Sequence, residues 1–350
     1  MTRFRTRAAV IFITTALGCT VAAAPALTAN ASSPALYPTI ARASAGWLAG
    51  QLVQGNHFVS VYDKVTSPDQ GETIDAIFAF AAARVENSVG ASAIAWLEQP
   101  SVLSGYIGAG TESYAGETAK VALAAEVRGL NPASFGKVNL IARLAKLLAK
   151  SGRYSDHSVY GDYSNAFSQA LAIIALSRDG GAPARAVRFL VSSECKNGGY
   201  PLDFGQKTCV SDTDATAMDA QALLAAGQRT AALRGLKWLA SVQQANGGFD
   251  TVGGTSPNAN TTGLAGEAFA AAGLSRPEAR AAKFLTSLVV GCSAPSAERG
   301  ALAYDKTGYN KSTAVDATAQ GILGLADVSL AKLSARGSSE SVFVQVVCTG

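Results

Sequence analysis

The fold is decided by a loop with the sequence Gln243-Gln244-Ala245-Asn246-Gly247-Gly248-Phe249-Asp250. Before it, an amphipathic stretch around Trp238 carries charge on one side and apolar residues at helical spacing. The glycine pair supplies the left-handed residue that ends a helix, and Ser, Thr, Asp or Asn residues beyond it are suited to cap the next one. Residues 262–272 then form a stretch of almost entirely small and apolar residues. The segment therefore predicts two helices joined by a tight loop.

This pair of helices recurs along the chain. The bulky residue of the first helix returns at spacings of 49, 48, 45, 49 and 46 residues, at Trp47, Trp96, Leu144, Phe189, Trp238 and Phe284. The second helices are predicted at 74–85, 117–127, 165–176, 214–226, 262–272 and 313–325. Literal words recur too, since Asn197-Gly198-Gly199-Tyr200 matches residues 246–249 and Asp214-Ala215-Thr216-Ala217 returns at residues 316–319. We expect six helix pairs.

The composition of the two helix types predicts how the pairs assemble. The second helices carry Ala and Gly on most faces and are expected to pack closely as an inner ring, with the charged first helices outside. Such pairs can also stack as an open superhelix, but the count of six and the lack of polar capping repeats favour closure. The predicted fold is all-α, an α6/α6 toroid over residues 32–337.

Residues 1–31 are predicted to be a bacterial-type secretory signal peptide. Three arginines between residues 3 and 7 precede an apolar run over 8–24, and Ala29-Asn30-Ala31 matches the pattern read by signal peptidase. The run is too short and too rich in Ala and Thr for a membrane span. Leu17-Gly18-Cys19 resembles the end of a lipobox, so lipid anchoring at Cys19 is the alternative. Export to the extracellular space is the main expectation.

The remaining cysteines number four, which in an exported chain favours disulfides over metal ligands. We expect Cys195–Cys209 to close a loop between two helices and Cys292–Cys348 to secure the C-terminal segment, residues 338–350. Free buried thiols are the alternative. Residues 341–347 have a β-like composition, so this tail is a candidate short strand.

Charge excludes one class of partner. The net charge of +4 becomes +1 without the leader, because 26 basic residues then face 25 acidic ones. No basic run remains that would bind nucleic acid. The expected partner is an unidentified small molecule or an extracellular protein, and no metal or cofactor is predicted.

Residues 243–249 resemble the Q-x-x-x-G-G-[FW] element that is repeated in protein prenyltransferase β subunits and in squalene and other terpenoid cyclases. This superfamily shares the α6/α6 toroid, and it includes the cobalamin-carrier domains, whose inner helices open with words similar to Asp214–Met218. The resemblance extends over nearly the whole chain after the leader through the repeat spacing, although one copy of the motif is sharp. It predicts the fold more strongly than the function.

The resemblance also implies a cyclase alternative. Asp212-Thr213-Asp214-Ala215-Thr216-Ala217 looks like the D-x-D-D-T-A motif of class II cyclases, with Asp214 at the position of the acid that protonates an alkene. Ala215 replaces the following Asp, however, and a bland interpretation makes Asp212 or Thr213 the cap of an inner helix. The candidate catalytic residues are Asp212, Asp214 and Asp219.

Other enzyme classes find less support. A zinc prenyltransferase needs a free Cys on an inner helix, and a thioester domain needs a Gln after Gly291-Cys292; the sequence has neither. A secreted carbohydrate-active (α/α)6 enzyme would need two facing carboxylates. The candidate acids for it are Glu72, Asp75, Glu117, Asp214, Asp219, Glu267 and Asp316.

The main functional expectation is a non-catalytic binding or scaffold module with a polar concave mouth. Its lining is expected to include Glu72, Asp75, Glu117, Lys120, Asn165, Gln169, Asp214, Thr262, Thr313 and Asp316. A binder should show solvated carboxylates that only cap helices. An enzyme should show an acid with a strongly raised pKa in an apolar pocket, which gives a way to separate the two.

Overall fold

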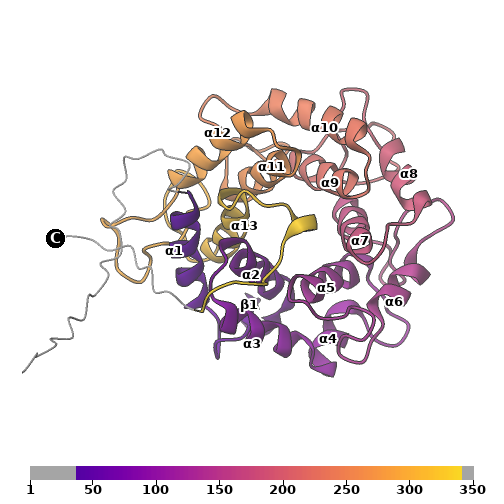
Figure 1. Ribbon diagram of the computed structural model, residues 1–350, viewed down its shortest axis with the longest axis horizontal. Helices are drawn as coiled ribbons and strands as arrows, with labels where there is room; N and C mark the ends of the chain where they lie inside the picture. The colour runs from indigo at the N-terminus through magenta and orange to yellow at the C-terminus, as the bar shows by residue number, and fades with distance from the viewer. Residues whose placement is uncertain (1–36, 341–350) are drawn as a thin grey trace, which may run out of the picture.

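The computed structural model describes residues 37–340, which are mostly helical (Figure 1). These residues form thirteen α-helices, one short 3-10 helix and one two-stranded sheet. The helical class expected from the sequence is confirmed, with a small hairpin as an addition.

An inner ring of helices surrounds the centre of the molecule. It consists of α2 (Gln70–Ala83), α5 (Ala115–Val127), α7 (Ala166–Arg178), α9 (Thr213–Ala225), α11 (Ala259–Ala272) and α13 (Ala314–Leu325). Each helix packs against the next along this order, and α13 packs against α2 (Figure 1). The described residues therefore close into a toroid rather than opening into a superhelix.

The other helices lie outside this ring. They are α1 (Tyr37–Ala49), α3 (Asn87–Leu97), α4 (Pro100–Ile107), α6 (Leu140–Leu147), α8 (Ala184–Ser192), α10 (Arg229–Val242) and α12 (Ser275–Thr286). They pack on neighbouring inner helices, as α10 does on α9 and α12 on α11. Trp47, Trp96 and Trp238 lie on α1, α3 and α10, where the sequence placed them.

Some elements have no counterpart in the sequence-based prediction. Besides α4, they are the strands β1 (Phe58–Tyr62) and β2 (Val65–Asp69) and the 3-10 helix η1 (Leu330–Lys332). The two strands pair antiparallel through a turn in which Asp63 and Lys64 have φ angles of 45° and 64°. Turns of this kind usually contain Gly, so Asp-Lys is a weak sequence signal for a hairpin.

Small residues allow the inner helices to approach backbone to backbone. At Gly263 of α11, an added Cβ would overlap the backbone oxygen of Gln320 on α13. At Gly324 it would come 2.8 Å from the Cα of Gly263. Any larger side chain at these positions would push the two helices apart, which confirms the expectation of close packing through Ala and Gly.

A repeated hydrogen bond fixes each outer loop to its inner helix. The backbone N–H of Tyr200 donates to Thr216 Oγ1 at 2.8 Å, and that of Phe249 donates to Thr262 Oγ1 at 3.0 Å. The same bond recurs from Phe58 to Thr73, from Tyr154 to Gln169 and from Leu302 to Thr318. Thr216 and Thr262 are fully buried, so these bonds satisfy backbone groups that water cannot reach.

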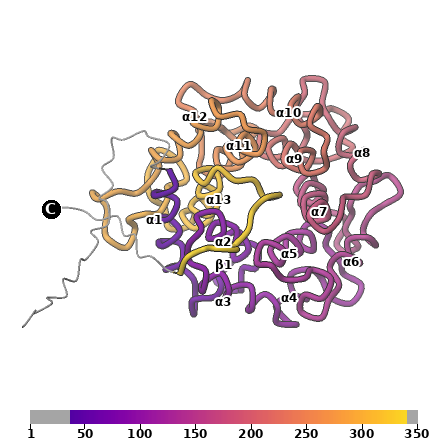
Figure 2. The backbone as a smooth tube through the Cα atoms, viewed as in Figure 1, coloured from indigo at the N-terminus to yellow at the C-terminus, as the bar shows by residue number. Residues whose placement is uncertain are grey.

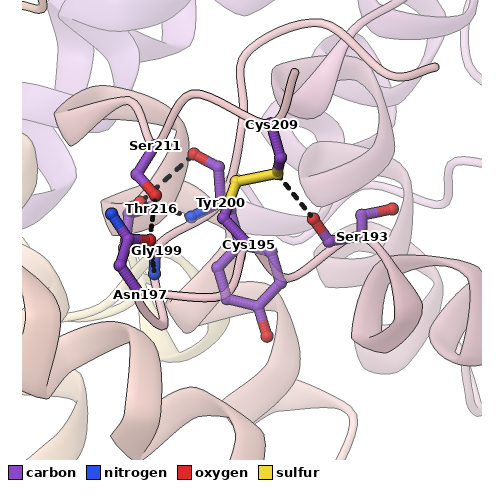
Figure 3. Close-up of a disulfide and its surroundings, with 8 residues drawn as sticks. All are labelled: Ser193, Cys195, Asn197, Gly199, Tyr200, Cys209, Ser211 and Thr216. Atoms are coloured by element: carbon purple, nitrogen blue, oxygen red, sulfur yellow. Dashed lines mark hydrogen bonds between the residues drawn. A yellow bond between two sulfur atoms is a disulfide. The ribbon is translucent and has the colours of Figure 1, made fainter. Parts of the chain in front are cut away.

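The loop before α9 carries a disulfide as well (Figure 3). Cys195 and Cys209 are bonded, with 5.5 Å between their Cα atoms, which confirms this predicted pair. Just after this loop, Ser211 donates to Asn197 Oδ1 at 2.6 Å (Figure 3). The backbone N–H of Asp212 donates to the Tyr200 backbone oxygen at 2.8 Å. Asp212 then caps α9 by accepting from the Ala215 N–H, in line with the bland interpretation.

The chain after α13 returns across one end of the ring, as the yellow segment of Figure 2 shows. The backbone N–H of Leu330 donates to Gln221 Oε1 at 3.2 Å. The Arg178 guanidinium donates to the backbone oxygens of Leu330 and Ala331 and forms an ion pair with Glu126 at 3.1 Å. This segment therefore forms a floor that closes the toroid at that end.

Several predictions concern residues outside the described range. The leader, Cys19, Cys348 and the possible strand over 341–347 all lie there. Cys292 is disulfide-bonded, and its pairing with Cys348 stays a prediction. No helix within residues 37–340 combines the length and apolarity that a bilayer span requires.

The buried threonine bond can be tested with Thr216→Val. This change keeps the shape but leaves the Tyr200 N–H without its acceptor, so the free energy of unfolding should fall by about 1–3 kcal/mol. Urea denaturation gives the measurement, with the exposed Thr111→Val as the matched control. Equal stability of the two variants would show that the bond contributes nothing.

The disulfide can be tested with the double variant Cys195→Ala/Cys209→Ala. The bond closes a loop with a sequence separation of 14 residues, so its loss should lower the free energy of unfolding by about 3 kcal/mol. Urea unfolding without reductant measures the effect. A double variant as stable as the wild type would contradict a stabilising clamp.

Candidate functional site

A cavity of about 350 Å³ lies in the centre of the toroid. Its wall is formed by Asp75, Phe78, Tyr106, Gly116, Glu117, Lys120, Tyr163, Asn165, Phe167, Ser168, Leu171, Met218, Leu264, Glu267, Gln320, Leu323 and Leu330. Every inner helix contributes to this wall, and Leu330 comes from the floor segment. The cavity volume is within the usual range for small-molecule sites.

The inner helices run parallel, which gives the cavity two different ends. Side chains on neighbouring helices meet at matching depths: Asn260 with Asp316 in the first turns, Lys120 with Asp75 in the second, and Gln221 with Glu267 in the third. Ser168 of α7 likewise lies against Gly116 of α5, both in first turns. The six N-termini therefore lie at one end, which we call the mouth. The floor segment closes the opposite end.

The floor end of the cavity is mainly apolar. Phe78 and Leu323 in third turns line it together with Leu330 of the floor segment, and Met218 and Leu264 lie one turn nearer the mouth. Such a surface would hold a hydrocarbon ligand and exclude water from it.

Glu267 is an acidic residue that lines the cavity at this apolar end. Its side chain is fully buried, and Oε2 accepts a hydrogen bond from Gln221 Nε2 at 3.2 Å. Its Oε1 atom has no hydrogen-bond partner among the described residues. Burial raises the pKa of Glu267 to about 8. At neutral pH the group is therefore mostly a neutral carboxylic acid with a proton to donate.

One ion pair lies in the cavity wall, between the neighbouring helices α2 and α5. Lys120 Nζ lies 2.8 Å from Asp75 Oδ2 and also donates to the Gly71 backbone oxygen at 3.1 Å. Burial lowers the pKa of Lys120, but Asp75, Tyr106 and Glu72 together raise it above its usual value, so the ammonium stays charged. Nearby, burial raises the pKa of Tyr106 to about 12.

Carboxyl groups gather at the mouth. Burial, followed by the neighbouring acids Asp316 and Asp75, raises the pKa of Glu72 to about 9. Burial also raises the pKa values of Asp214 and Asp316 to about 6 each. These acids stand in the first turns of inner helices, whose positive dipole ends attract carboxylates.

The residues predicted to line a mouth separate into three groups. Asp75, Glu117, Lys120 and Asn165 line the cavity. Glu72, Asp214, Thr313 and Asp316 lie at or beside the N-termini of inner helices, outside that lining. Gln169 and Thr262 are fully buried, where they accept from the outer loops.

The three candidate catalytic acids on α9 also differ in position. Asp212 caps the helix and Asp214 lies in its first turn, at the mouth. Asp219 is completely buried, and neither carboxyl oxygen has a hydrogen-bond partner within residues 37–340. Burial raises the pKa of Asp219 well above its usual value. None of the three lines the cavity.

Sequence reasoning did not anticipate two of the aromatic side chains of the site, Phe78 and Phe167. Phe78, Tyr106, Tyr163 and Phe167 all line the cavity, although the tryptophans lie on outer helices. Glu267 was named among the acids but was given no special place. The available signal was an acid in the third turn of a helix that is otherwise small and apolar.

Known structures share this architecture. A protein from Actinoplanes has a TM-score of 0.62 and 16% identity, covering 83% of this chain and 99% of the other. The type II terpene cyclase MstE from Scytonema, without ligand, has a TM-score of 0.62 and 12% identity, covering 84% and 98%. A variant of MstE with its substrate geranylgeranyl dihydroxybenzoate also has a TM-score of 0.62 and 12% identity, covering 86% and 98%.

The chain has the fold of a type II terpene cyclase. This confirms the resemblance to the prenyltransferase and terpenoid cyclase superfamily that the loop motif indicated. No protein-family model matches the sequence, and no curated protein matches it significantly.

These neighbours overturn the expectation of a non-catalytic binding or scaffold module. They include a terpene cyclase with substrate bound, and so favour the enzyme alternative. The physical reason lies in the cavity, because the polar mouth is one end of a chamber whose other end is apolar and holds a neutral acid. The sequence showed the polar helix starts, but the depth of Glu267 depends on ring closure.

The protonation of Glu267 has a measurable consequence for stability. Between the ordinary pKa of 4.5 and the folded value of about 8, the folded state keeps a proton that the unfolded chain releases. Raising the pH through this window therefore destabilises the wild type through this group. Glu267→Gln stays neutral, so its stability relative to the wild type should increase from pH 5 to pH 8. Urea denaturation at both pH values measures this.

A matched control for this test is Glu98→Gln, an exposed position. Its difference from the wild type should show no comparable increase. A constant difference between Glu267→Gln and the wild type at pH 5 and pH 8 would contradict a neutral Glu267.

Proposed function

We propose that this protein is a terpenoid cyclase-like enzyme that starts the cyclisation of an isoprenoid polyene by protonating an alkene. The observation that carries the proposal is Glu267, a neutral carboxylic acid that lines a cavity whose surroundings at that depth are apolar. Protonation of an alkene needs a donor that is not ionised at working pH and whose proton is not taken up by water instead. Burial of Glu267 meets both conditions.

The proposed reaction is an isomerisation and needs no oxidant. The Glu267 proton adds to the terminal alkene carbon, and the alkene π electrons form the new C–H bond. The resulting tertiary cation is attacked by the π electrons of the next alkene, which closes a ring through a C–C bond. The last cation loses a proton to water or to a carboxylate at the mouth. Glu267 regains its proton from solvent, so atoms and charge balance.

The cavity wall contains groups that would stabilise the cations. Phe78, Tyr106, Tyr163 and Phe167 present aromatic rings, whose faces attract positive charge. The acidic groups nearer the mouth add negative potential. The wall thus supplies electrostatic stabilisation along the path between the floor and the mouth.

The choice between Glu267 and Asp214 as donor rests on their surroundings. Asp214 matches the donor position of the class II motif, and its pKa of about 6 leaves it mostly ionised at neutral pH. Glu267 lines the cavity and has a pKa of about 8, so we assign the first proton transfer to Glu267. Asp212 acts as a helix cap, and Asp219 is assigned no step.

The finer features of the fold belong to the same proposal. We take the chain to be six helix-pair repeats, which the spacing of 45–49 residues and the inner ring both support. We also propose export, supported by the leader-like start and the Cys195–Cys209 disulfide. Its partner would then be an isoprenoid available outside the cytoplasm.

The test is turnover by purified protein given farnesol, geranylgeraniol or geranylgeranyl dihydroxybenzoate, with products identified by mass spectrometry. Glu267→Gln should lower the rate of cyclisation at least about 100-fold, because it removes the general acid. Asp214→Asn should retain most of the rate. If Asp214→Asn is inactive and Glu267→Gln is active, the donor is Asp214.

The matched control is Glu278→Gln on the outer helix α12. Burial raises the pKa of Glu278 to about 7, so this variant also replaces a perturbed acid, but far from the cavity lining. It should turn over substrate as the wild type does. Failure of the wild type to cyclise any of these polyenes would refute the proposed function.

A further inference from the structure

The mouth carries acidic groups, of which Asp214 and Asp316, with pKa values of about 6, are mostly ionised at neutral pH, whereas Glu72, with a pKa of about 9, is mostly neutral. Glu72, Glu117, Asp214 and Asp316 stand in the first turns of four inner helices. Glu117 lines the cavity directly, whereas Gln320 of the lining donates to Asp316 Oδ1 at 2.9 Å. A ligand head in the cavity therefore lies against Glu117 and near Asp316.

Among the described residues that line the cavity, Lys120 is the one cation, and it is already neutralised. Lys120 has its ammonium 2.8 Å from the Asp75 carboxylate and a second bond to the Gly71 oxygen. A ligand anion would have to compete with Asp75 for this ammonium and would leave that carboxylate buried and unpaired. Lys120 therefore offers a single remaining N–H rather than a free positive charge.

The helix dipoles offer no anion site either. Six parallel inner helices direct their positive ends at the mouth, which would favour a phosphate if those ends were free. Acids in the first turns of α2, α5, α9 and α13 already occupy four of these ends. At α7 and α11 the Asn165 and Asn258 side chains accept hydrogen bonds from first-turn N–H groups instead. A diphosphate would meet like charge where the bare backbone would have attracted it.

Neutral hydrogen-bonding groups remain at the same depth. Asn165 uses its side-chain oxygen to accept from the Phe167 and Ser168 backbone N–H groups, so its amide N–H can face a ligand. The Ser168 and Tyr106 hydroxyls line the same wall. These groups suit an alcohol, a phenol or an ester oxygen.

We infer that the substrate is an amphipathic isoprenoid with an uncharged, oxygen-bearing head at the mouth and its terminal alkene at Glu267, and that the mouth acids reject polyprenyl diphosphates. This inference rests on the proposed function and adds the substrate class and the residues that select it. Glu117 and Asp316 are the selecting residues. Entry tail first places the alkene at the floor, because the apolar wall is at that end.

The experiment compares two substrates with the same C20 chain, geranylgeraniol and geranylgeranyl diphosphate. The wild type should cyclise the alcohol with a kcat/KM at least about 100-fold above that of the diphosphate, equivalent to two tenfold steps in transition-state binding. The double variant Glu117→Gln/Asp316→Asn should narrow this ratio at least about tenfold, mainly through a lower KM for the diphosphate. Glu278→Gln should leave the ratio unchanged.

A binding measurement separates failure of this inference from failure of the proposed function. In thermal unfolding, geranylgeraniol should raise the Tm of the wild type, and the diphosphate should raise it only for the double variant. Circular dichroism of the double variant verifies its fold. Turnover of the diphosphate equal to that of the alcohol, or an unchanged ratio in the double variant, would overturn the inference and leave the cyclase proposal standing. If no substrate is cyclised, the proposed cyclase function is wrong. If the wild type binds the diphosphate more tightly than the alcohol, the proposed rejection of diphosphates is wrong.

Discussion

The structure depends on how closely the inner helices approach one another. Gly263 and Gly324 bring the backbones of α11 and α13 together, and Ala residues serve the same purpose around the ring. Because these side chains are small, the helices can converge in parallel and close the circle through α13 and α2. A ring built from larger residues would be wider, and its centre would be open to water.

Ring closure also explains the electrostatic division of the cavity. Parallel helices place all their N-termini at one end, where their dipoles favour acids. The opposite end is formed by later turns, whose side chains are mostly apolar. The floor segment then seals the apolar end through Arg178, Gln221 and Leu330. Glu267 is fully buried beside this segment, and burial is the main cause of its raised pKa.

Much of the fold could be predicted from the sequence because it depends on local patterns. The Gly-Gly loops and the alternation of amphipathic and small-residue helices set the helix pairs, and the Cys195–Cys209 spacing indicated a loop clamp. The β1–β2 hairpin was missed because Asp63-Lys64 lacks the Gly that usually marks such a turn. The hydrogen bonds that Thr216 and Thr262 accept from the outer loops were not predicted, because a Thr near a helix start is also an ordinary cap. For the same reason Thr262 was expected at the mouth.

The site was less predictable because it depends on depth within the ring. Asp75, Glu117, Lys120 and Asn165 were expected to line a hollow and do so, since first- and second-turn positions follow from the repeat. The importance of Glu267 could not be derived from spacing, because its burial depends on ring closure and on contacts between residues far apart in the sequence, such as that with Gln221. The central claim is that Glu267 is a neutral acid inside the cavity. It is tested most directly by the carboxyl carbon resonance of ¹³C-labelled glutamate, assigned with Glu267→Gln. The account predicts that the Glu267 resonance keeps the chemical shift of a protonated carboxyl group through neutral pH and titrates near pH 8. A Glu267 resonance that titrates near pH 4.5 would contradict it.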